Sequence, residues 1–246
     1  MFSMDPRGGH NRYKFKTDFF KKWTPEMAYV LGFLYADGDI EDTKKSSRTQ
    51  YVKFTSKDKE LLVAIKDALG CNHRINARKP FAAIYPNGKI YKNSTCYYLR
   101  IGSKKMFADL VNIGLTPRKS LTIKFPSLIP SDFLKDFIRG YFDGDGCVTI
   151  KTGIGKRGQK ILKGLAVIFT SGSRDFLEGL ADNANRFFGL QKKDIYFNRN
   201  AYYLKYNTKE SLRLFELFYD SRNLFLKRKF DIFNRYLKLK HGGVAK

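Results

Sequence analysis

The stretch VLGFLYADG at residues 30–38 returns in altered form as IRGYFDGDG at residues 138–146. Each of these two motif stretches is apolar, carries small residues four positions apart and closes on Asp-Gly. Glycine inside a helix costs about 1 kcal/mol relative to alanine, so matched glycines in two stretches need a structural reason. We expect two helices that pack backbone against backbone. Asp37 and Asp145 would then lie side by side at equivalent helix ends.

The duplication extends beyond the motif stretches. Residues 54–56 (FTS) return as residues 169–171, and residues 97–100 (YYLR) return as residues 202–205 (YYLK). All matches follow in the same order at similar spacing. The chain is therefore predicted to contain two similar half-domains in tandem.

Prolines mark the joint between the halves, because Pro117, Pro126 and Pro130 interrupt regular structure. Residues 1–17 are mostly polar and contain no apolar run, and we expect them to be a flexible arm or a cloning remnant. The predicted organisation is an arm at 1–17, a first half-domain at 18–116, a linker at 117–130 and a second half-domain at 131–246.

The charge of the chain points to a polyanionic partner. The 246 residues contain 47 Lys and Arg against 23 Asp and Glu, a formal net charge of +24. Such an excess most often serves nucleic-acid binding. The basic residues are interleaved with Phe, Tyr and Leu, which argues against an arm that merely coats RNA; membrane-surface binding is the minor alternative.

Cysteine usage and hydropathy point to an intracellular protein. The three cysteines are scattered and form no C-x-x-C pair, so neither a zinc site nor a disulfide framework is predicted. No secretory signal and no bilayer-spanning stretch is visible in the sequence. We expect a DNA-associated protein of a prokaryotic cytoplasm or nucleoid, or of an organelle matrix, that is not secreted.

Start signals and apolar periodicity predict the helices. Thr24-Pro25 predicts a cap for the first motif helix, and Ser131 or Asp132 can cap the second. Amphipathic packing helices are expected at 56–69, 173–188 and 224–240.

Stretches of period two follow each motif stretch and predict sheets with an apolar inner face and a basic, polar outer face. Such an outer face can enter the major groove of DNA and read base edges. Residues 151–164 are expected to form a flexible basic hairpin tip, so the glycines of GIGKRG at 153–158 are not a nucleotide-binding loop. The predicted DNA-binding residues are Lys53, Arg74, Asn76, Arg78, Tyr98, Arg100, Thr149, Lys151, Lys156, Arg157, Tyr203 and Lys205.

Two adjacent carboxylates repel unless a cation intervenes. Oxygen ligands of this kind suit Mg²⁺, and metals between carboxylates and a phosphodiester can activate water and stabilise the leaving oxygen. The three histidines have no paired spacing, which argues against a histidine general base. Lysines can stabilise developing charge. Lys119 is one candidate, and the repeat spacing points to Lys227 as its counterpart, with Lys229 as the alternative.

The motif stretches, together with GLTPRKS at 114–120, resemble the double-motif LAGLIDADG homing endonucleases over nearly the whole chain after about residue 18. The resemblance implies an α/β (α+β) fold of two pseudo-symmetric αββαββα half-domains, with a saddle-shaped β-sheet surface for DNA and the motif helices at the interface. Similar proteins are monomers that cut a long, asymmetric double-stranded DNA site with Mg²⁺ and leave 3′ overhangs. Mn²⁺ is expected to replace Mg²⁺, and Ca²⁺ to support binding without cleavage. No protein partner and no membrane is implied.

Site residues follow from the resemblance position by position. The metal-binding acids fall on Asp37 and Asp145, assisted by the carbonyl groups of Ala36 and Gly144. The active-site lysines fall on Lys119 and Lys227, and the polar residues that often organise water fall on Ser56 and Ser171. The first motif stretch departs from the pattern at Tyr35, where the second has Asp143, a position that is usually structural.

Three rival functions stay open. An RNA maturase of the same fold would act on intron RNA. An endonuclease embedded in an intein would need a splicing domain, and its nucleophilic N-terminus and terminal Asn are not seen here. A non-cleaving DNA-binding regulator would normally have lost the two acids, and their presence favours an enzyme.

Overall fold

The computed structural model describes residues 13–43, 49–80, 82–84, 90–92, 94–220 and 224–242. The first half of the chain contains α1 (Pro25–Asp37), β1 (Gly38–Asp42), β2 (Gln50–Ser56), α3 (Lys59–Ala68), β3 (Asn76–Arg78), β4 (Ala82–Ile84), β5 (Ile90–Lys92), β6 (Cys96–Gly102) and α4 (Lys104–Ile113). The second half contains α5 (Leu134–Asp145), β7 (Gly146–Ile154), β8 (Lys160–Ser171), α6 (Arg174–Phe188), β9 (Ile195–Asn198), β10 (Ala201–Tyr206), α7 (Thr208–Tyr219) and α8 (Lys227–Gly242). Two 3₁₀ turns, Lys119–Leu121 and Ser131–Phe133, lie between the halves.

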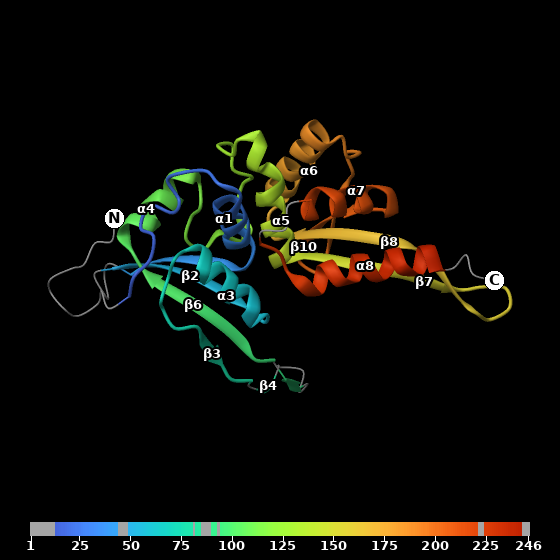
Figure 1. Cartoon of the computed structure of the whole chain (residues 1–246), viewed down its shortest axis with the longest axis horizontal. Helices are drawn as coiled ribbons and strands as arrows, with labels where there is room; N and C mark the ends of the chain where they lie inside the picture. The colour runs from blue at the N-terminus through green and yellow to red at the C-terminus, as the bar shows by residue number, and fades with distance from the viewer. Residues whose placement is uncertain are drawn as a thin grey trace.

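Figure 1 shows one sheet in each half of the molecule. Both sheets are antiparallel and have the same topology. The strand orders are β1-β2-β6-β3 and β7-β8-β10-β9, and β4 pairs with β5 apart from them. The register repeats as well: Phe54 pairs with Gly38 and Leu99, as Phe169 pairs with Gly146 and Leu204. The predicted αββαββα duplication is confirmed; β4 and β5 are an addition to the first copy and α8 to the second.

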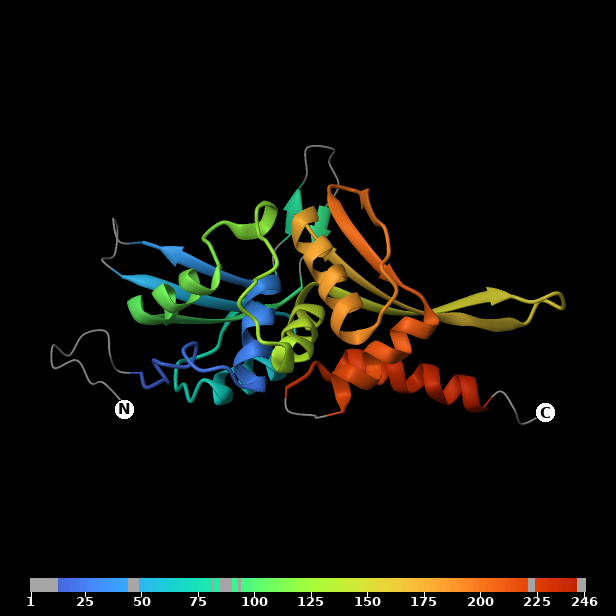
Figure 2. The same ribbon diagram turned by 90° about the horizontal axis from the view of Figure 1, so that it is seen from above.

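The two motif helices, α1 and α5, lie side by side at the centre of the molecule with one sheet to either side (Figures 1 and 2). Thr24 caps α1 as expected, because its hydroxyl oxygen accepts a hydrogen bond from the Met27 amide at 3.1 Å. The predicted cap of the second helix is wrong. Ser131 and Asp132 belong to a 3₁₀ turn that leads into α5, and no side chain caps the first turn of α5.

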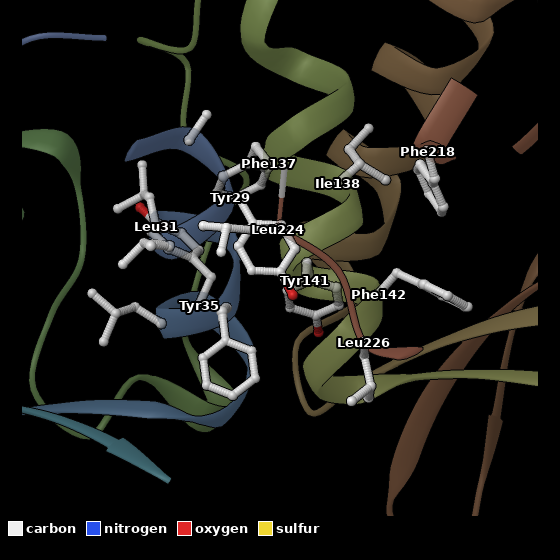
Figure 3. Close-up of a cluster of buried hydrophobic side chains, with 14 of the residues drawn as sticks. Tyr29, Leu31, Tyr35, Phe137, Ile138, Tyr141, Phe142, Phe218, Leu224 and Leu226 are labelled. Atoms are coloured by element: carbon white, nitrogen blue, oxygen red, sulfur yellow. The ribbon is translucent and has the colours of Figure 1, made fainter. Parts of the chain in front are cut away.

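The small residues of the motif stretches are explained by the close approach of these helices. A Cβ atom added at Gly32 would overlap the Phe137 carbonyl, and one added at Gly140 would overlap the Tyr29 carbonyl. Large apolar side chains fill the remaining space between α1 and α5, among them Tyr29, Tyr35 and Phe137 (Figure 3). The two halves therefore share one continuous hydrophobic core.

The hairpin of β7 and β8 projects beyond the body of the second half (Figure 2). We predicted a flexible tip at 151–164, but β7 continues to Ile154 and β8 begins at Lys160. Only residues 155–159 form the turn. A register shift between Lys151 and Thr152 lets the ladder continue past Gly164.

Two expected boundaries change in the structure. Residues 13–17 of the predicted arm lie against the first half, where the Lys16 amide donates to the Leu69 carbonyl at 2.9 Å. The predicted linker at 117–130 packs on the second half, since the Phe125 ring contacts the rings of Phe137 and Phe176. This segment joins the halves as part of the core.

Candidate active site at the junction of the halves

Asp37 ends α1 and Asp145 ends α5, so the packing of these helices brings both acids to one junction. A Cβ added at Gly144 would lie 3.3 Å from the backbone nitrogen of Asp37, which shows how closely the two ends approach. Gly38 and Gly146 then turn the chain directly into β1 and β7. Both aspartates keep solvent-exposed surface.

The two carboxylates influence each other's ionisation. Partial loss of hydration, followed by the negative charge of Asp37, raises the pKa of Asp145 to about 6. Loss of hydration also raises the pKa of Asp37, against the opposing effect of Lys229 and Lys119. A junction that disfavours two negative charges is one where a cation would stabilise the ionised forms.

Lys119 lies in this junction although its segment was predicted to be a linker. The side chain is buried, and Nζ donates to the carbonyl oxygens of Gly38 at 2.8 Å and Ala36 at 3.2 Å. Burial lowers the pKa of Lys119, while the charges of Asp145, Asp39 and Asp37 raise it. The residue before it, Arg118, takes the left-handed conformation at φ 57°, which turns the chain inward at this point.

The structural counterpart of Lys119 is Lys229, and the prediction of Lys227 is wrong. Lys229 is 2% exposed, and its Nζ donates to the Phe142 carbonyl, to the Asp143 carbonyl at 3.0 Å and to the Gly146 carbonyl at 2.5 Å. Burial lowers its pKa to about 8. Lys227 instead points outward and pairs with Asp231 at 2.6 Å, with 73% of its side chain exposed.

The difference of two residues between the predicted Lys227 and the observed Lys229 has a structural cause. The first lysine begins the 3₁₀ turn Lys119–Leu121, whereas the second lies on the first turn of α8, so a constant interval does not connect them. Lys229, the alternative that the sequence left open, makes the matching contact: its Nζ donates to the carbonyl of Gly146, which is the counterpart of Gly38, the residue that Lys119 contacts.

The oxygen donors at the junction suit a hard divalent cation that keeps part of its water. In the described part of the chain no group of three or more His, Cys, Asp and Glu side chains could hold a metal. The candidate side-chain ligands are Asp37 and Asp145, and the candidate backbone ligands beside them are the carbonyl groups of Gly144 and of Ala36, which also accepts from Lys119. Mg²⁺ is commonly bound by one or two carboxylates together with water and phosphate oxygen, so the donor set fits it.

Ser56 and Ser171 end β2 and β8 at equivalent points. Each hydroxyl oxygen accepts a hydrogen bond at 3.1 Å from an amide two residues on, that of Asp58 or Ser173. Both serines are buried and each fixes the turn into the following helix. The Ser171 side chain also hydrogen-bonds the Tyr141 phenol. For both serines a role in organising water stays a prediction.

The outer faces of the two sheets carry matched rows of side chains. Thr55, Tyr98 and Asn76 pair across the first sheet, as Thr170, Tyr203 and Tyr196 pair across the second. The next row contains Asp39, Lys53 and Arg100 in the first sheet and Cys147, Ile168 and Lys205 in the second. Predicted DNA-binding residues from different strands are thus brought onto one face in each half.

Acidic and aromatic residues on the first sheet were missed in the sequence. Glu41 accepts hydrogen bonds from Arg100 at 2.5 and 3.1 Å and lies 3.8 Å from Lys53. The Arg100 guanidinium also lies 3.5 Å from the centre of the Tyr51 ring. The alternation of β1 could have indicated Glu41, because this residue faces the same side as Asp39.

The remaining predicted DNA-binding residues are spread more widely. Arg74 precedes β3 and is exposed, so it is not a strand residue as expected, while Arg78 ends that strand. Thr149 is exposed on β7, and Lys151 donates to the Asn207 side chain at 3.2 Å. Lys156 and Arg157 are exposed in the turn of the projecting hairpin.

Comparison with known proteins finds one family along most of the chain. The model of the LAGLIDADG-like domain family matches residues 24–113 and again residues 132–217. Similar solved structures include the homing endonuclease I-WcaI bound to its DNA recognition sequence, with 16% identity, a TM-score of 0.54 and coverage of 87% of this chain and 90% of that one. The LAGLIDADG meganuclease I-AabMI bound to uncleaved DNA is also 16% identical, with a TM-score of 0.55 and coverage of 90% and 91%.

A curated relative of a different kind shares a shorter region. DNA-directed RNA polymerase subunit Rpo1C of Methanocaldococcus jannaschii is 26% identical over 166 residues, which cover 66% of this chain and 16% of that subunit. The chain thus spans about a sixth of the length of this relative. In the described part of the chain, no helix has the length and apolar character needed to cross a bilayer.

Proposed function

This chain belongs to the family of LAGLIDADG-like domain proteins, and from that premise we propose that it is a site-specific DNA endonuclease of the homing type. The observation that carries the proposal is the junction itself. Two matched aspartates end two closely packed helices, and each half adds one buried lysine, Lys119 or Lys229, against the backbone of its own motif helix.

The proposed reaction is hydrolysis of one phosphodiester in each strand of double-stranded DNA, giving a double-strand break with 3′ overhangs. Asp37 and Asp145 would hold Mg²⁺, with the carbonyl groups of Ala36 and Gly144 beside them. The bound cation would supply electrophilic assistance to the phosphate and to the attacking water. Lys119 and Lys229 would place positive charge near the phosphate as its negative charge develops. Ser56 and Ser171 would orient water at the edge of the site.

The outer faces of the sheets supply the recognition surface in this proposal. The net charge of +24 favours a phosphate backbone, and the rows of polar side chains can present donors and acceptors to base edges. The rows differ between the halves, with Asp39, Lys53 and Arg100 matched by Cys147, Ile168 and Lys205. One monomer would therefore read a long, asymmetric site, within whichever compartment holds that DNA.

The test is cleavage of a randomised or genomic DNA pool with Mg²⁺, followed by sequencing of the new ends. A matched variant carries Asp37→Asn and Asp145→Asn together. One recurrent site with short 3′ overhangs, absent with the variant, would support the proposal, and Mn²⁺ should replace Mg²⁺.

Ca²⁺ should support binding of the recovered site without cutting. Binding to DNA or structured RNA without any cleavage in Mg²⁺ or Mn²⁺ would contradict the proposal. That outcome would favour a non-cleaving regulator or an intron RNA maturase of the same fold.

A further inference from the structure

Asp143 is a fully buried carboxylate that no step of the proposed reaction uses. It lies two residues before Asp145, the last residue of α5, and is 2% exposed. Its Oδ2 atom accepts two hydrogen bonds of 2.8 Å, one from the Tyr29 hydroxyl group and one from the Leu226 amide. Among the described residues its Oδ1 atom has no hydrogen-bond partner. A buried carboxylate with an unpaired oxygen costs stability, so its presence calls for a compensating role.

The contacts of Asp143 lead directly to Lys229. The Leu226 amide donates to the Asp143 carboxylate, and the Leu226 carbonyl accepts a hydrogen bond from the Lys229 amide at 3.0 Å. The Lys229 side chain then returns to α5, where Nζ donates to the Asp143 carbonyl at 3.0 Å. The start of α8 is thus held to α5 by two contacts, the Leu226 amide on the Asp143 carboxylate and Lys229 Nζ on the Asp143 carbonyl. Tyr29, which donates to the same carboxylate, is the member of this network that comes from the first half. Figure 3 shows Tyr29 between the motif helices and Leu226 beside the end of α5.

The hydrogen bond between Tyr29 of α1 and Asp143 of α5 has no counterpart at the equivalent positions of the two helices. Tyr35 occupies the place of Asp143 and Phe137 the place of Tyr29, and their rings meet edge to face at 5.2 Å. Among the described residues the buried Tyr35 hydroxyl group has no hydrogen-bond partner. Lys119 is held by its own turn instead, since its carbonyl accepts the Thr122 and Ile123 amides at 3.0 and 2.9 Å.

We propose that Tyr29 and Asp143 are positioning residues for Lys229, so that the first half controls the lysine of the second half while Lys119 is set independently. This inference rests on the proposed function, because its readout is the cutting of two DNA strands. Loss of the Tyr29 hydroxyl group should weaken one half of the reaction only. A role confined to stability would affect both strands alike, because both depend on the same folded protein.

The experiment compares Tyr29→Phe with Tyr35→Phe, a matched control that removes a buried hydroxyl group from the same helix. Single-turnover cutting is followed on the site recovered from the pool, with each strand labelled separately. Lys229→Met and Lys119→Met identify the strand that depends on each lysine. Tyr29→Phe should slow the Lys229-dependent strand on the order of tenfold and leave the other within about twofold, while Tyr35→Phe changes neither. Asp143→Asn should show the same strand bias.

Equal slowing of both strands by Tyr29→Phe, or no slowing of either, would overturn the inference while leaving the proposed function intact. If the parent cuts nothing, the proposed function fails, and hydrogen exchange still tests the contact. Amides of residues 224–230 should then exchange faster in Tyr29→Phe than in Tyr35→Phe. Equal exchange in the two variants would overturn the inference on its own.

Discussion

Replacing Gly140 by alanine tests the packing on which the whole site depends. The added Cβ atom would overlap the Tyr29 carbonyl oxygen and would lie 2.9 and 3.0 Å from the Tyr29 carbonyl carbon and the Phe33 nitrogen. All three atoms are helix backbone and cannot rotate away, so α5 must move back from α1. That movement would also stretch the 2.8 Å hydrogen bond between Tyr29 and Asp143.

The expected loss combines two opposing effects. Overpacking costs about 1–3 kcal/mol, and the rigid backbone contact here favours the upper end. Alanine recovers about 1 kcal/mol over glycine within a helix. The net loss in the free energy of unfolding should be about 2 kcal/mol. The urea m-value of a chain of this length is about 2–3 kcal/mol/M, so that loss lowers the midpoint of urea unfolding by roughly 0.7–1 M.

The assay can use the fluorescence of Trp23, the only tryptophan of the chain, which stacks on Phe133 with ring centres 6.3 Å apart. This pair bridges the two halves and reports their separation. Gly102→Ala is the matched control, because its Cβ would meet side-chain atoms, those of the Tyr51 ring at 3.3 and 3.6 Å and Thr49 Oγ1 at 3.9 Å, and side chains can shift. A Gly140→Ala protein as stable as the parent would refute the argument that the helices pack backbone to backbone.

Three further predictions concern the site and the sheet. Lys229→Met should slow single-turnover cutting by roughly 10²–10³, whereas Lys227→Met stays near the parent rate; equal effects would contradict the assignment. Because the raised pKa of Asp145 disfavours its ionised form in the folded protein, parent stability without metal should fall as pH rises from about 4 to about 6. Melting temperatures of Asp145→Asn should fall less over this range, because the raised pKa of Asp37 remains, and a pH profile parallel to that of the parent would argue against the shift assigned to Asp145. Glu41→Gln should free Arg100, tighten DNA binding and steepen its dependence on salt, and weaker binding would speak against that interpretation.

The fold could be predicted because the repeated features are local in the sequence. A few neighbouring residues are enough to recognise each of these features, namely the paired glycines, the Thr24-Pro25 helix start and the alternating strands. Gly32 and Gly140 indicated a close helix contact, and the structure contains it. The predicted cap of the second motif helix failed because Ser131 and Asp132 form a 3₁₀ turn after Pro130, so that Phe133 is the residue directly before α5.

The site could be predicted only in part. The positions of Asp37 and Asp145 follow from their own motif stretches, but the lysines come from segments that pack differently in the two halves. Lys229 lies in the first turn of α8 and Lys119 follows a left-handed residue, so the repeat interval missed the second lysine by two residues, about half a turn of helix. The pairing of Glu41 with Arg100 depends on the register of three strands, which periodicity alone does not determine.

In the part of the chain that the structure describes, the projecting hairpin of β7 and β8 reaches further than its counterpart, β1 and β2, in the first half. The nine residues of β7 extend about 30 Å, whereas the five residues of β1 extend about half as far. On duplex DNA, with about 3.4 Å of helix axis per base pair along each strand, the longer arm would run alongside roughly nine base pairs. The footprint of the protein would therefore be lopsided about the point of cutting, and the flank followed by the hairpin would tolerate fewer sequence changes than the opposite flank.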